Sequence, residues 1–192
     1  MSLIMEMIVD ELLRSDYSIP KRFGIETPDE MLRFARESGF YHDIGKIMVP
    51  PLILKKQGRL TADELNEIHR HTVYAKELMM PCLGELSTSD RPYYLAVIEV
   101  CLSHHEHWDG TGYPCGLSGT DIPFFARVCT IADSYDAMVS RRLYSRAVTH
   151  TAAVDEIRRC GGTQFDPEIA KAFFRVCPDV HTLLMQKGKE PR

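Results

Sequence analysis

Long apolar runs are missing from this chain of 192 residues. No stretch approaches the ~20 consecutive apolar residues that span a bilayer, and no signal-peptide pattern precedes the first predicted helix. An excess of basic residues is missing too, because 23 lysines and arginines stand against 27 acidic residues, for a net charge of −4. These absences argue against membrane insertion and against a DNA-binding protein that works through a broad basic surface.

Paired cysteines are also absent. The six cysteines are scattered without a C-x-x-C pair, which excludes zinc-finger chemistry. Most have apolar neighbours, so we expect them, Cys115 included, to pack as free thiols in a cytoplasmic protein. At ~100–200 residues per domain, the length predicts a single domain. The opening Met1-Ser2-Leu3 is compatible with a chain cut from a longer protein.

The alternation of polar and apolar residues that is typical of strands is lacking, and the periodicity is helical. Capping boxes at Thr27–Glu30 and Thr61–Glu64 predict helices that run to about His42 and to Pro81. Further helices are predicted over 3–14, from Asp90 to about His105, over 124–139, from about Thr149 to Gly161, and from Asp166-Pro167 to about Val176. We therefore predict an all-α single domain over 1–192, with a first helix and linker (1–27), a region that holds the motifs (28–176) and a C-terminal tail (177–192).

Histidines and aspartates collect where a helical core should be apolar. His42-Asp43 and His104-His105 each end a predicted helix. His71 lies within another, and Asp133 interrupts the most hydrophobic helix of the chain. Because an unpaired buried carboxylate is costly, a cation shared between helices would account for these residues together. Imidazoles and carboxylates without thiolates suit iron, manganese or zinc. A bridging carboxylate such as Asp43 would hold two ions ~3.5–4 Å apart, the spacing that activates water for attack on phosphorus.

A second motif indicates a resemblance to a known family. Residues His104 to Pro114 fit the pattern HHExxDGxGYP, and His42-Asp43-Ile44-Gly45-Lys46 precedes it. With the segments Asp133–Ala137, Arg142–Tyr144 and Gly162–Pro167, these residues make the chain resemble the HD-GYP family of HD metal-dependent phosphohydrolases, which are bacterial phosphodiesterases of cyclic di-GMP. The resemblance covers roughly residues 28–176. It implies a helical HD-type domain with a GYP loop, from Gly110 to Pro114, and additional C-terminal helices.

Carried over position by position, the resemblance implies metal ligands at His42, Asp43, His71, His104, His105 and Asp133. Catalytic roles fall to Asp43 and to Lys46, whose charge would offset the charge that develops on the phosphate. Substrate contacts are implied for Lys46, Gly112, Tyr113, Pro114, Asp136 and Arg142. Tyr113 either faces the nucleotide or packs the loop onto the domain, and Arg142 either binds phosphate or forms a surface salt bridge. The other histidines match no ligand position: His69, His107, His150 and His181.

No histidine precedes His42, and there the chain departs from the family pattern. Relatives with three ions use a glutamate and a histidine one helical turn apart on the first helix, where this chain has Glu6 and Asp10. Asp10 either supplies an oxygen ligand in place of the histidine, or both acids face solvent. The expected cofactors are two divalent ions, iron or manganese foremost and zinc as the alternative, with a third ion left open.

The resemblance implies hydrolysis of cyclic di-GMP to linear pGpG, and then to GMP, by a metal-bridging hydroxide. The alternative is a weakly active or inactive cyclic di-GMP sensor that docks on GGDEF-domain proteins, which the missing upstream histidine favours. A generic HD nucleotidase would explain His42-Asp43 but would leave the GYP loop without a role. A fused sensory or receiver domain in the full-length protein is a further expected partner.

Overall fold

The computed structural model describes residues 1–15, 25, 27–140 and 147–186, and the regular secondary structure within these ranges is entirely helical. The all-α prediction is thereby confirmed. The α-helices are α1 (Ser2–Arg14), α2 (Pro28–Tyr41), α3 (Pro51–Leu54), α4 (Ala62–His69), α5 (His71–Met79), α6 (Arg91–Ser103), α7 (Phe124–Val139), α8 (His150–Arg159) and α9 (Pro167–Gln186). Short 3-10 helices cover η2 (Ile44–Met48), η3 (Met80–Glu85) and η4 (Gly119–Asp121).

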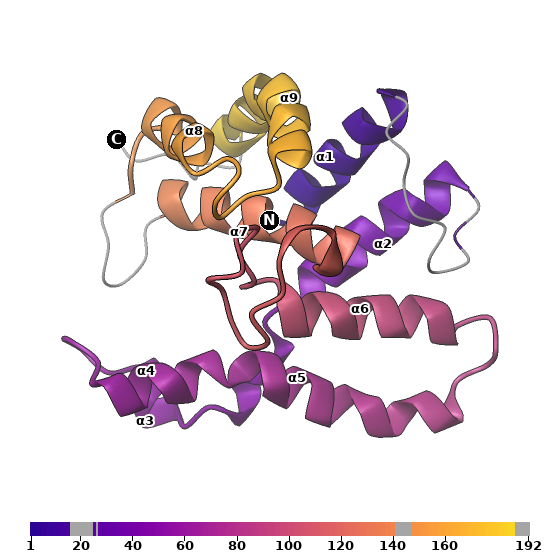
Figure 1. Cartoon of the computed structure of the whole chain (residues 1–192), viewed down its shortest axis with the longest axis vertical. Helices are drawn as coiled ribbons and strands as arrows, with labels where there is room; N and C mark the ends of the chain where they lie inside the picture. Colours follow the sequence, from indigo (N-terminus) through magenta and orange to yellow (C-terminus); the bar gives the residue numbers. More distant parts are fainter. Residues whose placement is uncertain (16–24, 26, 141–146, 187–192) are drawn as a thin grey trace.

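Helix α7 lies in the middle of the domain, between α8 and α9 on one side and α6 on the other (Figure 1). Its side chains are apolar on nearly every face, and such a helix is stable only when it is buried. Phe125, Val128, Ile131 and Tyr135 are accordingly buried in the main core, which α1, α2 and α9 complete. A polar residue on α7 therefore lies inside the protein rather than on its surface.

Local capping signals set the start of three helices as the sequence predicts. Both capping boxes form, and in each the threonine hydroxyl accepts the N–H of the glutamate three residues later, at 3.2 Å. The Asp166 carboxylate accepts the N–H of Glu168 at 2.8 Å and caps α9. Its other oxygen accepts from Arg127 on α7, in a buried ion pair that ties the two helices together.

The helix predicted from Thr61 to Pro81 is two helices, α4 and α5, separated at Arg70. The Nδ1–H of His71 donates to the carbonyl of Ile68 at 2.7 Å, and the Thr72 hydroxyl donates to the carbonyl of His69 at 3.0 Å. These carbonyls would accept backbone N–H groups in a continuous helix. Side chains that bind these carbonyls compete with the backbone N–H groups, and the interruption lies where both bonds occur.

The prediction that the last helix ends near Val176 is also wrong, because α9 continues through Pro178 to Gln186. Proline has no N–H to donate to the carbonyl four residues before it. That carbonyl, of Phe174, accepts the thiol of Cys177 at 3.3 Å instead. Burial of Val180 and Leu184 in the main core keeps this last part of the helix in place.

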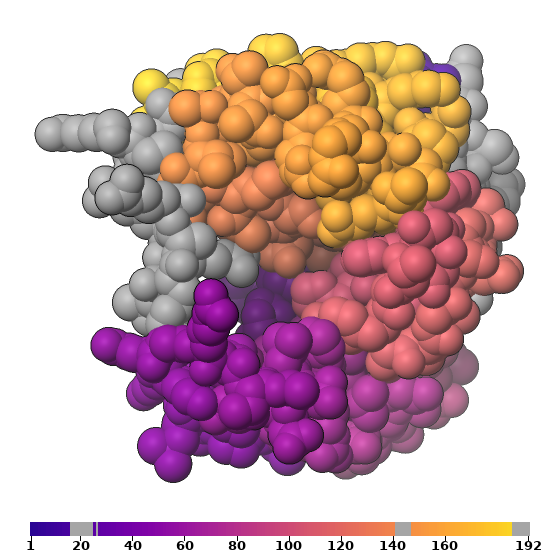
Figure 2. All heavy atoms as spheres, turned by 60° about the vertical axis from the view of Figure 1, so that its left-hand side comes forward, coloured from indigo at the N-terminus to yellow at the C-terminus, as the bar shows by residue number. Residues whose placement is uncertain are grey.

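The space-filling view shows a hollow between the segment that forms α3 to α5, below, and the segment that forms α7 and α8, above (Figure 2). Across the described ranges, no helix combines the length and the apolar character that a membrane crossing needs.

Candidate metal centre

His42 and Asp43 lie where α2 ends and η2 begins, and both side chains are half-buried. The Nδ1–H of His42 donates to the carbonyl of Gly39 at 2.9 Å, which leaves Nε2 with its lone pair. This Nε2 lies 3.2 Å from Oδ2 of Asp43 and 3.8 Å from Oδ1 of Asp133 on α7. The dyad and Asp133 are therefore neighbours in space, although about 90 residues separate them in sequence.

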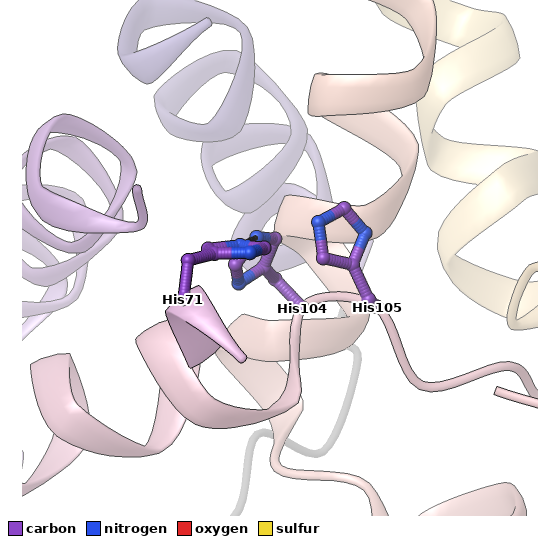
Figure 3. Close-up of side chains that lie close together, drawn as sticks. All are labelled: His71, His104 and His105. Atoms are coloured by element: carbon purple, nitrogen blue, oxygen red, sulfur yellow. Dashed lines mark hydrogen bonds between the residues drawn. The ribbon is translucent and has the colours of Figure 1, made fainter. Parts of the chain in front are cut away.

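His71, His104 and His105 point into one common space from the start of α5, the end of α6 and the turn that follows it (Figure 3). The Nε2 atoms of His71 and His104 are 3.4 Å apart. The Nδ1–H of His104 donates to the carbonyls of Val100 and Cys101, both at 3.0 Å. Backbone carbonyls thus hold His42, His71 and His104 in the tautomer that presents Nε2 inward, as the outer partners of metal-ligating histidines do.

The Asp43 carboxylate lies at the centre of these rings. Its Oδ1 is 3.4 Å from Nε2 of His71 and 3.9 Å from Nε2 of His104. This Oδ1 is buried and accepts no hydrogen bond from any residue that the structure describes. A buried carboxylate oxygen without a donor costs ~1–3 kcal/mol, and a divalent cation held by the neighbouring nitrogens would offset that loss.

Two overlapping sets of donor atoms, each within 4.8 Å of one another, can hold a cation: those of His71, His104 and His105, and those of His42, Asp43 and His104. The nitrogen and oxygen donors and the orphaned oxygen of Asp43 fit a divalent transition metal.

Burial keeps three of the imidazoles neutral, which is the form that binds metals. It lowers the pKa of His104 to about 3 and, with the neighbouring His104 ring, the pKa of His105 to about 2. Burial also lowers the pKa of His71.

The His42–Asp43 pair behaves in the opposite way. Burial opposes the charged form of His42, but the hydrogen bond and charge of Asp43 outweigh it and raise the pKa of His42. Burial likewise opposes the carboxylate of Asp43, yet His42 and Lys46 hold the pKa of Asp43 far below its usual range. The centre therefore carries the anionic carboxylate of Asp43 beside the three neutral rings of His71, His104 and His105, which suits a cation.

We expect the metal-free protein to lose stability as the pH falls below ~6.5, the ordinary pKa of histidine. The unfolded chain takes up protons there, whereas folded His104 and His105 stay neutral to about 3 and about 2. The unfolded state then binds more protons, so the free energy of unfolding falls by ~1.4 kcal/mol per pH unit for each such imidazole. His71 adds to this loss and His42, with its raised pKa, offsets part of it.

Thermal denaturation in the presence of a chelator, between pH 7 and pH 5, measures this effect. The midpoint should fall by at least ~2–4 °C per pH unit, the shift expected for ~1 kcal/mol in a chain of this length. A midpoint that stays level or rises over that range would contradict neutral burial of these rings.

The GYP loop is folded back onto the turn that carries His105. The buried carboxylate of Glu106 accepts the N–H groups of Cys115 at 2.7 Å and of Leu117 at 3.0 Å. Tyr113 donates its N–H to the carbonyl of His105 at 3.1 Å. Gly112 has no room for a Cβ, which would lie 2.3 Å from the nitrogen of His107.

Glu106 also explains a wrong prediction about the cysteines. Cys115 is exposed, because Glu106 binds its N–H and turns the backbone rather than the side chain inward. Cys82 is exposed as well, while the other four cysteines are buried and free.

Tyr113 packs between two histidine rings. Its ring lies 4.8 Å from that of His105 and 4.0 Å from that of His69, and both pairs are stacked. This is the arrangement in which the ring packs the loop onto the domain.

Sequence reasoning missed the roles of Glu106 and His69. Glu106 gave a signal, as an acid directly after the two histidines of a turn motif. His69 gave none, because its contact with Tyr113 joins two segments about 40 residues apart in the sequence.

The remaining predicted site residues lie apart from the cluster, at its edge, or outside the described residues. Glu6 accepts the Arg36 guanidinium at 2.9 Å, and Asp10 pairs with Arg14 at 2.7 Å, so the structure does not bring these acids to the cluster. Lys46 lies at its edge, with Nζ 2.6 Å from Oδ2 of Asp43. Two further predicted contacts, Asp136 and Pro114, lie one turn beyond Asp133 and next to Tyr113, while Arg142 is outside the described residues.

Residues 25–169 match the HD domain family. The chain belongs to the HD domain family. Its HHExxDGxGYP segment and its relatives place this HD domain in the HD-GYP group. It is 41% identical to a probable cyclic di-GMP phosphodiesterase of Vibrio cholerae over 69% of this chain and 30% of that protein. It is 40% identical to a cyclic di-GMP phosphodiesterase of Thermotoga maritima over 78% of this chain and 39% of that protein.

A third relative differs in the substrate that its name prints. The HD domain is 35% identical to a 3'3'-cGAMP-specific phosphodiesterase 2 of Vibrio cholerae, over 68% of this chain and 24% of that protein. It is also similar in fold to the crystal structure of a cyclic GMP-AMP-specific phosphodiesterase of the same species, with a TM-score of 0.50 at 16% identity, over 95% of this chain and 45% of that one. The chain spans between a quarter and two fifths of the length of these three curated relatives.

Proposed function

We propose that this HD domain hydrolyses a cyclic dinucleotide, cyclic di-GMP in the first place, at the cluster centred on Asp43. The observation that carries the proposal is the buried, unbonded Oδ1 of Asp43 within a group of histidines whose Nε2 atoms face it. Relatives named as phosphodiesterases of cyclic di-GMP or of cGAMP support this class of substrate.

Two divalent ions, iron or manganese foremost, would be held by His42, Asp43, His71, His104, His105 and Asp133. When bound, such ions activate water for attack on phosphorus and neutralise charge on the phosphate. The pairing of Glu6 with Arg36 and of Asp10 with Arg14 supports a count of two rather than three.

The residues of this chain would supply orientation and charge. Backbone carbonyls fix the rings of His42, His71 and His104, so these rings would already be oriented when metal ions bind. Lys46 lies beside Asp43 and is partly exposed, so its ammonium group can reach a phosphate at the edge of the cluster. No side chain has to form a covalent intermediate, and linear pGpG, then GMP, are the proposed products.

Incubation of the metal-loaded HD domain with cyclic di-GMP or with 3'3'-cGAMP, followed by chromatography, tests the proposal. We expect linear pGpG from cyclic di-GMP. Turnover of 3'3'-cGAMP without turnover of cyclic di-GMP would mean that the substrate is a cyclic dinucleotide other than cyclic di-GMP. Binding of cyclic di-GMP without turnover would favour a sensor that docks on GGDEF-domain proteins, and absence of both binding and turnover would refute the proposal.

Substituting Lys46 with alanine should leave the metal content unchanged and lower kcat by ~10²–10³-fold, the range seen when one group that stabilises transition-state charge is removed. Metal content is measured by mass spectrometry and kcat by chromatography of the products. Lys55→Ala is the matched control, because Lys55 is an exposed lysine at the end of α3 and should keep the wild-type kcat. A wild-type kcat in the Lys46 variant would remove this role.

A further inference from the structure

Three aromatic rings are stacked at the edge of the metal centre, and they come from three separate segments. His69 ends α4, Tyr113 belongs to the GYP loop, and His105 is one of the rings of the cluster. The planes of His69 and Tyr113 differ by 14°, and those of Tyr113 and His105 by 24°. Tyr113 thus lies between His105, which is a candidate metal ligand, and His69, which is not one.

The interruption at Arg70 makes this stack possible. On a continuous helix, residues two positions apart point to different sides. Here α4 ends at His69 and α5 begins at His71, and the ring of His69 stacks on Tyr113 while His71 belongs to the cluster. The hydrogen bonds of His71 and Thr72 to the carbonyls of Ile68 and His69 lie at this interruption.

The two faces of the Tyr113 ring are supported differently. On the side of His105, hydrogen bonds of the backbone hold the loop as well. The N–H of Tyr113 donates to the carbonyl of His105, and the N–H of Cys115 donates to the carboxylate of Glu106. On the outer side, the ring stacked on Tyr113 is that of His69, and no other aromatic ring among the described residues stacks there.

We propose that His69 is a positioning residue that presses Tyr113 against His105 and thereby fixes the substrate-facing loop over the metal centre. The inference rests on the proposed function for the identity of the substrate. A flat ring at position 69 is what the stack requires. Loss of that ring frees the loop but removes no ligand of the cluster, so substrate affinity changes more than the chemical step.

Steady-state kinetics on cyclic di-GMP separate these effects. His69→Ala should raise KM by ~2- to 12-fold, the range expected for one lost aromatic pair, and leave kcat and the metal content nearly unchanged. His69→Phe, which keeps a flat ring, should restore KM. His107→Ala is the matched control, because His107 lies in the same loop region but bonds to Thr111 instead of stacking on Tyr113.

A second readout does not depend on activity. The protein is labelled with 3-fluorotyrosine, and the resonance of Tyr113 in the ¹⁹F spectrum is assigned by its loss in Tyr113→Phe. In His69→Ala this resonance should move toward that of an unstacked fluorotyrosine, whereas His107→Ala should leave it in place.

The two readouts distinguish failure of this inference from failure of the proposed function. An unchanged KM in His69→Ala, or a fall in kcat at constant KM, would overturn the positioning role while wild-type turnover upholds the proposed function. If the wild type neither binds nor hydrolyses cyclic di-GMP, the proposed function fails, and an unmoved ¹⁹F resonance in His69→Ala then rejects the stack as well.

Discussion

Replacing His71 or Asp133 with alanine should remove metal and activity together, with hydrolysis of cyclic di-GMP lowered by more than ~10²-fold. Even outer-shell partners of metal ligands commonly change affinity or activity 10–100-fold, and these side chains face the cluster directly. Nε2 of His71 lies 3.4 Å from Oδ1 of Asp43, and Oδ1 of Asp133 lies 3.8 Å from Nε2 of His42. Each substitution therefore removes a donor atom that no other described residue replaces.

Metal content by mass spectrometry and product formation by chromatography measure this result on the same samples. His107→Ala serves as the control, since it removes a histidine that bonds to Thr111 at the surface. If both variants retain the wild-type metal content, neither residue belongs to the site, whatever the change in activity.

Gly45→Ala should destabilise the protein by ~3 kcal/mol or more, because overpacking against rigid backbone cannot relax cheaply. A Cβ on Gly45 would lie 1.9 Å from the carbonyl oxygen of His71 and 2.6 Å from the nitrogen of Ala75. Helix η2, which follows Asp43, would have to move away from α5. The same movement would separate Asp43 from His71, so metal binding should weaken as well.

Thermal denaturation of the metal-free variant should show a midpoint lowered by roughly 6–12 °C. Gly84→Ala is the matched control, because no atom lies within 4 Å of the Cβ it would add. That control should stay within ~0.5 kcal/mol of wild type. Equal midpoints for the Gly45 variant and the wild type would show that η2 does not approach α5 this closely.

Much of the fold could be predicted because its signals are local. The threonine and glutamate of a capping box are three residues apart, so the starts of α2 and α4 are visible in the sequence, and Asp166 announces α9 in the same way. The interruption at Arg70 and the continuation of α9 through Pro178 are different. They depend on side chains that bind backbone carbonyls and on packing that no periodicity records.

The same distinction between local signals and contacts across the fold applies to the candidate metal centre. The candidate ligands are visible in the sequence, because His42-Asp43 and the HHExxDGxGYP segment are contiguous motifs and Asp133 is a charge in an apolar helix. The contacts of Asp133 with His42, of Glu6 with Arg36 and of His69 with Tyr113 are visible in the folded chain alone. A motif specifies neighbours along the chain. Contacts between helices depend instead on how side chains pack. Here they bring His42, His71 and His104, at the ends of α2, α5 and α6, to the carboxylate of Asp43, and Asp133 of α7 to His42.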